Sequence, residues 1–255
     1  YNQLVEADEN EVEHEYASAY RGKVQNRKVD EDLMPMYVLS YRRQSEGVKS
    51  FNAFDSDVEH FNTTAHPSQP IYVRTHDKAL TQEETQAFFT LIDNLSERIA
   101  GIKDFTKDRA LLIERAVAYT VVQNFEEAIT ALSAYTQTDS TSSVAYWQRA
   151  VCQALMNEFT QSQGMEANLK TARTLSDFEE AIRRNPQNAF LYYDRGNVYA
   201  ARQDYQHALD DYSRAIALEP NLAEAYYNRG LILIRTGKRK EGIDDLSKAG
   251  ERGLY

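Results

Sequence analysis

The feature that most constrains the fold is a five-residue pattern that returns at a fixed spacing in the C-terminal part of the chain. Residues 192–196 read YYDRG, and residues 226–230, which lie 34 positions later, read YYNRG. The related segments 112–116 and 146–150 are also 34 positions apart, and the second of them lies 46 positions before residues 192–196. A period of 34 residues is typical of stacked helical hairpins, because one hairpin cannot bury its apolar face alone. The longer interval is one period plus 12 residues, which we place in the irregular-looking stretch 157–170.

Within one period, small, aromatic and proline residues occupy places that suit two packed helices. Small residues let the two helices approach closely, and a proline ends the second helix because it cannot continue the hydrogen-bond ladder. The repeat at 189–222 has the complete pattern, with Tyr192, Gly196, Tyr199, Ala208, Tyr212, Ala215 and Pro220. This pattern resembles the tetratricopeptide repeat (TPR) family, over residues 107–255. Two repeats depart from it at the proline position, where Ser140 and Leu254 stand instead.

The resemblance implies a mainly α fold, a right-handed TPR superhelix of four helical hairpins. The expected repeats are 109–142, 143–188 with the 12-residue insertion, 189–222 and 223–255. TPR arrays usually close with a solvating helix, and no residue follows Tyr255 here. We therefore expect the outer face of the fourth repeat to be exposed apolar surface that is open to self-association.

A different pattern fills the N-terminal region, residues 1–80, for which no family is recognised. Segments of alternating or continuous apolar residues predict a small β-rich region ahead of the repeats. The expected strands are 11–24, for which an amphipathic helix is the alternative, 34–41, 48–54 and 71–75. A capping box at residues 81–84 then predicts a helix that packs between the N-terminal sheet and the first repeat, within a helix-and-linker segment 81–106.

The TPR resemblance also predicts where a partner would bind. In this family the first helix of each hairpin lines a concave groove, and aromatic anchors in such a groove are typical binding hot spots. An alternative is that these rings only pack against neighbouring helices. The residues that correspond to the groove are Ile113, Val117, Val144, Trp147, Val151, Phe190, Tyr193, Asn197, Tyr227 and Leu231.

Arginine occupies the seventh position of all four repeats, where the family more often has leucine. These residues are Arg115, Arg149, Arg195 and Arg229. They could form a cationic ladder for an acidic ligand. The other interpretation is that each lays its aliphatic stem over apolar surface and pairs locally with carboxylates.

Composition and motif searches argue against several other functions. The net charge of −10 and the pI near 5.1 disfavour nucleic acid, which needs a basic patch, and would attract a basic protein partner instead. No apolar stretch reaches the roughly 18 residues that span a bilayer. Cys152 stands without a nearby histidine in a repeat helix and is expected to be a small buried residue rather than a nucleophile. We expect no catalytic residues and no cofactor.

One cluster has residue types that bind metals, but its spacing matches no known zinc motif. It is interpreted as a solvated polar turn rather than as a metal site. Its members are Asp55, Asp57, Glu59, His60 and His66.

Taken together, the sequence favours a non-enzymatic scaffold that binds a peptide or partner segment. One alternative is a structural segment of a longer solenoid or self-assembling protein, and another is a metal-dependent activity in the N-terminal region. The chain begins at Tyr1 without a methionine, so we interpret it as a fragment or processed form, which leaves an exported and a cytoplasmic location both open.

Overall fold

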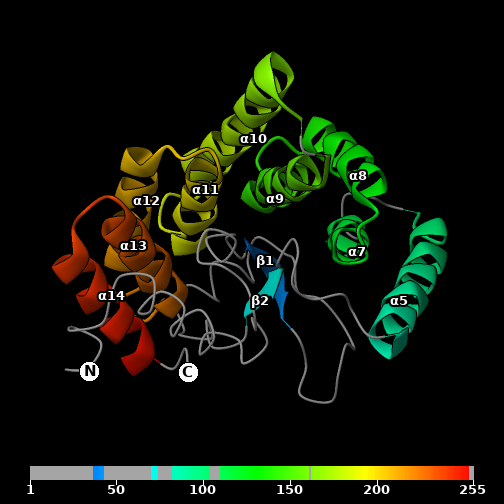
Figure 1. Ribbon diagram of the computed structural model, residues 1–255. Helices are drawn as coiled ribbons and strands as arrows, with labels where there is room; N and C mark the ends of the chain where they lie inside the picture. Colours follow the sequence, from blue (N-terminus) through cyan, green and yellow to red (C-terminus); the bar gives the residue numbers. More distant parts are fainter. Residues whose placement is uncertain (1–36, 43–69, 74–81, 104–109, 161, 253–255) are drawn as a thin grey trace. The chain divides into compact units, whose positions relative to one another are not determined.

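The computed structural model describes residues 37–42, 70–73, 82–103, 110–160 and 162–252 (Figure 1). These residues fall into two compact units, 37–191 and 192–252, which are treated separately below. Several sequence predictions lie outside the described residues. These are the strands at 11–24 and 48–54, the metal-ligand cluster at 55–66, the helix cap Thr81, and most of the linker at 102–106.

The first compact unit contains two complete helical hairpins. Helix α7 pairs with α8 and α9 pairs with α10, and α8 also packs against α9, so that consecutive hairpins are stacked (Figure 1). The bounds are α7 Ala110–Val121, α8 Phe125–Thr138, α9 Ser143–Thr160 and α10 Gly164–Arg184. These elements correspond to the expected repeats 1 and 2.

The second compact unit continues the same pattern. Helix α11 begins at the end of the first unit and enters the second, where it packs on α12 through Gly196 and the Tyr212 ring. Helix α13 then contacts both α12 and α14. The bounds are α11 Ala189–Ala201, α12 Tyr205–Leu218, α13 Ala223–Arg235 and α14 Arg239–Glu251.

The small residues of the repeat lie where the two helices of a hairpin come closest. A methyl group added at Gly230 would stand 2.8 Å from the carbonyl oxygen of Gly242, on the facing helix. At Gly196 it would stand 2.9 Å from the Tyr212 ring. Both distances are shorter than van der Waals contact, so the close packing of these hairpins depends on the absence of a side chain at these positions.

The prediction that the insertion in repeat 2 is irregular is wrong for the residues described. The insertion lengthens both helices of the hairpin: α9 has 18 residues where α11 has 13, and α10 has 21 where α12 has 14. Together these differences account for the 12 extra residues. The stretch has no proline, and Gly164 supplies the positive φ of 64° at the start of α10.

The lengthened tip of α10 carries the most exposed large apolar side chains in the described part of the chain. Met165 is 79% exposed and Leu169 is 57% exposed, one turn apart. Both residues lie at the lengthened end of α10, which has 21 residues where α12 has 14.

Helix α5, Gln82–Ala100, runs where the sequence predicts a helix ahead of the repeats. It buries Phe88, Ile92 and Leu95 and packs against α7. This contact resembles those of α8 with α9 and of α12 with α13, in which the second helix of one hairpin meets the first helix of the next. Helix α5 therefore takes the place of the second helix of a preceding hairpin.

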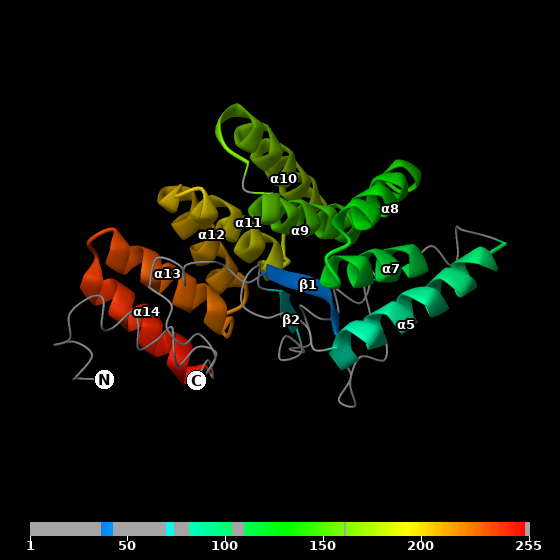
Figure 2. The ribbon, with the colours of Figure 1, turned by 45° about the vertical axis from the view of Figure 1, so that its right-hand side comes forward.

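Two short strands lie near the first hairpins. Strand β1, Tyr37–Arg42, pairs antiparallel with β2, Pro70–Val73, and the register places Tyr37 opposite Val73 and Leu39 opposite Ile71. They overlap the expected strands at 34–41 and 71–75. A two-stranded sheet does not by itself establish a β-rich region over residues 1–80, which remains a prediction. Strand β1 contacts both α7 and α9 (Figure 2).

The prediction of exposed apolar surface on the outer face of the fourth repeat is wrong for the described residues. Helices α13 and α14 expose no large apolar side chain, and Ile243 and Leu246 are buried. The reason lies in the sequence of α14, whose apolar residues follow one face, while the intervening positions such as Lys240, Glu241 and Asp244 are polar.

Candidate partner-binding surface

The ten predicted groove residues all lie on the first helices of the hairpins, α7, α9, α11 and α13. Every one of them is at most 2% exposed. In the first compact unit the rings of Trp147 and Phe190 are stacked with their centroids 6.3 Å apart, and in the second Tyr193 and Tyr212 lie 5.9 Å apart. These rings therefore pack on other parts of the chain, as the alternative interpretation requires. Contact with a partner remains a prediction.

A polar network joins the first helices of repeats 3 and 4. The Asn228 side chain donates to Tyr193 Oη at 3.3 Å and to Asn197 Oδ1 at 3.2 Å. The Tyr212 hydroxyl donates to the same Asn197 oxygen at 2.6 Å. Asn197 is fully buried, and these bonds satisfy its carbonyl oxygen, which explains how an asparagine is accommodated in this interior.

The sixth position of each repeat is also polar, and the sequence interpretation did not use this signal. The four residues are Glu114, Gln148, Asp194 and Asn228. Gln148 is 1% exposed, and neither its amide nitrogen nor its amide oxygen has a hydrogen-bond partner among the residues that the structure describes. The repeat explains why: Asn228 reaches Tyr193 and Asn197 on α11, whereas the residues at their places on α7 are Ile113 and Val117, which cannot form hydrogen bonds.

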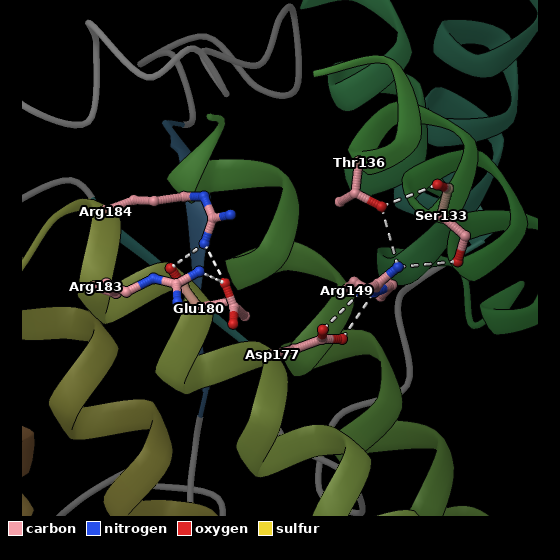
Figure 3. A network of polar contacts seen from close by, with 7 residues as sticks. All are labelled: Ser133, Thr136, Arg149, Asp177, Glu180, Arg183 and Arg184. Atoms are coloured by element: carbon pink, nitrogen blue, oxygen red, sulfur yellow. Dashed lines mark hydrogen bonds and ion pairs between the residues drawn. The ribbon is translucent and has the colours of Figure 1, made fainter. Parts of the chain in front are cut away.

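The seventh-position arginines pair with aspartates on the second helices of their own hairpins. Arg149 and Asp177 form two parallel hydrogen bonds of 2.7 Å (Figure 3). The equivalent bonds are 2.8 Å for Arg195 with Asp211, and 2.7 and 2.9 Å for Arg229 with Asp245. The hydrogen bond to Asp177 raises the pKa of Arg149, so this guanidinium stays charged. Local pairing is confirmed for these three arginines, which are not free cations for an acidic ligand.

The same arginines also link consecutive hairpins. Arg149 donates to the hydroxyl oxygens of Ser133 and Thr136 on α8, at 3.3 and 3.2 Å (Figure 3). Arg229 donates to Ser213 on α12 at 3.1 Å. Each of these two guanidinium groups thus fixes the second helix of its own hairpin and the second helix of the preceding one.

Arg115 is the exception among the four. At the place of the aspartate its repeat has Ala131, so Arg115 has no carboxylate partner among the described residues. It donates to Ser96 on α5 at 3.2 Å, and its Nε is buried without a partner. Ser96 thus stands where Ser133 stands for Arg149, which supports the placement of α5 as the second helix of a preceding hairpin.

In repeats 2 and 4, a second arginine lies over the ring of a first-helix tyrosine. This contact was not predicted from the sequence. Arg184 lies over the Tyr146 ring at 4.2 Å and donates to the Ser140 carbonyl. It also pairs with Glu180, to which Arg183 is bonded as well (Figure 3). The sequence contains a signal for this contact, because Arg252 lies two repeat periods after Arg184. The Arg252 guanidinium carbon lies 4.4 Å from the centroid of the Tyr226 ring, in the same arrangement.

The remaining candidate sites carry little chemistry in the described residues. Cys152 is fully buried, and its thiol donates to the Phe125 carbonyl at 3.5 Å. Burial raises the pKa of this thiol to about 12, which does not suit a nucleophile. Within the described ranges no three histidine, cysteine or carboxylate side chains gather as a metal site would require. No helix there is both long and apolar enough to cross a membrane.

Comparisons with known proteins agree with this geometry. Residues 196–237 match a family model described as TPR repeat. The crystal structure of MamA superposes with a TM-score of 0.53 at 20% sequence identity, covering 69% of this chain and 96% of that chain. TTC0263, a thermophilic TPR protein in Thermus thermophilus, superposes with a TM-score of 0.56 at 17% identity, covering 78% of this chain and 91% of that chain.

No curated protein sequence matches the chain. At identities of 20% and below, the structural matches bear on the fold alone. The stacked hairpins, the 34-residue period and the family match at residues 196–237 agree with one another. Residues 196–237 thus match the tetratricopeptide repeat family, and the other described hairpins share the helical-repeat fold of the TPR proteins to which the chain is similar.

Proposed function

We propose that this chain is a non-enzymatic protein-interaction scaffold that binds a peptide or partner segment on the first helices of its repeats. The observation that supports it is the row of stacked TPR hairpins, an architecture that generally serves protein binding. In the right-handed superhelix that the TPR resemblance implies, the first helices line the inner face. The ten predicted groove residues lie on those helices, together with the polar side chains of the sixth position.

The energetic scale of such binding is modest. A buried apolar anchor contributes roughly 1.5–3 kcal/mol by transfer, before the costs of ordering are subtracted. Two or three anchors would therefore support an affinity on the order of micromolar, which suits a regulated contact.

The test must keep the fold intact, because Trp147 and Tyr193 are buried and their replacement by alanine would disturb the core. We would probe a peptide array with the wild type and with the double variant Trp147→Phe plus Tyr193→Phe, which keeps an aromatic ring in the core at both positions but removes the indole group and the hydroxyl that a partner would contact. The control is Tyr205→Phe, on the second helix α12. We expect the double variant to lose affinity for captured peptides by about tenfold, and unchanged capture would contradict the proposal.

The alternative of a self-assembling solenoid segment is less well supported, since α13 and α14 expose no large apolar side chain. Light scattering over a range of concentrations tests it directly. A monomer at every concentration would count against self-association, and a mass that rises with concentration would favour it.

A further inference from the structure

Strand β1 packs on two of the helices that would carry the proposed binding surface. It contacts α7 and α9, the first helices of repeats 1 and 2 (Figure 2). Tyr37, its first residue, is 1% exposed and is among the largest fully buried side chains in the described part of the chain. A strand of 6 residues thus has an aromatic anchor buried in the first compact unit.

Half of the predicted groove residues belong to the two helices that β1 contacts. They are Ile113 and Val117 on α7, and Val144, Trp147 and Val151 on α9. All five are buried. The burial of these five side chains leaves none of them open to a partner in this structure, and β1 is the strand that packs on their two helices.

Among the described residues of α7 and α9, the closed state leaves buried polar atoms unsatisfied at Arg115, Gln148 and Gln153, and only Gln148 has both of its amide atoms in this state. Gln148 lies next to Trp147 on α9, is buried, and has no partner for either amide atom. A buried amide without hydrogen bonds is unfavourable relative to the same group in water. The backbone of an extended segment offers both N–H and C=O groups and could satisfy such an amide. The closed state is therefore stabilised less than a well-matched complex would be.

We propose that β1 is an intramolecular occupant of the partner-binding surface on α7 and α9, and that the partner is an extended polypeptide segment with an aromatic side chain that takes the place of Tyr37. This inference rests on the proposed function and names the class of partner. Because β1 belongs to the same chain as the surface that it covers, its binding is intramolecular, so weak contacts are enough to keep the surface closed.

The experiment uses the full chain in three forms: wild type, Tyr37→Ala, and the conservative Tyr37→Phe. The probe is a fluorescein-labelled peptide of residues 34–42, and the control peptide has alanine at the position of Tyr37. Affinity is measured by fluorescence anisotropy. We expect Tyr37→Ala to bind the probe at least tenfold more tightly than wild type and Tyr37→Phe, a difference of about 1.4 kcal/mol, and the control peptide to gain nothing.

Hydrogen exchange locates the contact. We expect the bound probe to slow amide exchange in α7 and α9 and to leave α13 and α14 unchanged. No binding to Tyr37→Ala, equal binding to all three proteins, or protection confined to α13 and α14 would each overturn the proposal. A wild-type dimer that Tyr37→Ala dissolves would also overturn it, because the strand would then occupy the surface of a second copy.

The two proposals fail in different ways. If the probe binds Tyr37→Ala but the peptide array yields no ligand for any form, the strand contact stands and the proposed function fails. If array peptides depend on Trp147 but bind wild type and Tyr37→Ala equally, the proposed function stands and the intramolecular occupant is excluded. Support for both requires that Tyr37→Ala captures array peptides at least tenfold more tightly and that these peptides are enriched in aromatic residues.

Discussion

Gly242 marks the closest approach of the two helices in the fourth hairpin. A methyl group at this position would stand 2.5 Å from Ile234 Cγ1, 2.6 Å from the Gly230 carbonyl oxygen and 2.9 Å from the Ile234 amide nitrogen. Two of these three atoms belong to the backbone and cannot rotate away. The helices α13 and α14 would have to move apart, which loses packing along the whole hairpin.

We therefore expect Gly242→Ala to lower the free energy of unfolding by about 1–3 kcal/mol, although alanine is the better helix former. The neighbouring Glu241→Ala is the control, because Glu241 is exposed. Urea denaturation followed by circular dichroism measures both. A Gly242→Ala variant as stable as the wild type would show that the two helices are not held at this distance.

Burial controls the chemistry of Cys152 in a way that a pH series can measure. Its pKa of about 12 lies well above the ordinary thiol value, so below that pH the side chain stays protonated in the folded chain. We expect negligible reaction with iodoacetamide at pH 8 and full reaction after denaturation in guanidinium chloride. The raised pKa also means that the unfolded chain loses this proton first, so the thiol lowers the stability of the fold progressively as the pH rises above its ordinary pKa. Rapid labelling of the folded chain at pH 8 would contradict the burial.

At the scale of elements, α5 is the one helix in the described part of the chain that does not belong to a complete repeat. It packs against α7 on the side where a preceding hairpin would stack, and its Leu95 is buried. Phe89 on the same helix is 40% exposed. Replacing Leu95 therefore tests the packing of α5, whereas replacing Phe89 changes a partly exposed position of the same helix.

Leu95→Ala is expected to destabilise the chain by about 2–5 kcal/mol, the range for removing a buried leucine side chain. Phe89→Ala serves as the matched control and should cost clearly less, because much of that ring remains in water. Urea denaturation compares them. Equal losses would mean that α5 does not use its buried stripe to cover α7.

At the scale of the whole molecule, tandem repeats interact with their nearest neighbours, so a local defect should remain local. Asp245 on α14 is buried and holds Arg229 of α13 through two hydrogen bonds. Asp245→Ala would leave a charged guanidinium without its carboxylate in a partly buried place, a change that costs about 3–5 kcal/mol when an ion pair is fully buried.

We expect this variant to speed amide exchange strongly in α13 and α14 while α7 and α8 keep the wild-type rates. Hydrogen exchange with mass spectrometry provides the measurement. The control is Asp244→Ala, whose exposed side chain pairs with Lys248 on the surface. A uniform increase over all helices would show that the repeats unfold as one cooperative unit instead.

Much of the helical architecture could be predicted from the sequence, because each repeat is encoded by residues that lie close together in the chain. The YYDRG pattern and its 34-residue period place the hairpins, and the small residues at Gly196 and Gly230 show where helices meet. The arginine–aspartate pairs could be predicted from the sequence only in part. Arginine at the seventh position recurs visibly, but the choice between a ligand ladder and local pairing depends on where Asp177 and its equivalents point.

Other features needed the tertiary structure because they depend on contacts between residues far apart in the chain. Periodicity could not show that the 12 inserted residues extend α9 and α10, since sequence spacing measures an insertion's length and not its conformation. The family pattern assigned Trp147 and Tyr193 to an open groove, whereas their burial depends on what else packs there. The contact of β1 with α7 and α9 joins segments far apart in the chain, and no local pattern encodes such a pairing. The sequence alone determined the repeated hairpins; the tertiary structure decided which of their surfaces are covered, because burial is a property of all neighbours at once.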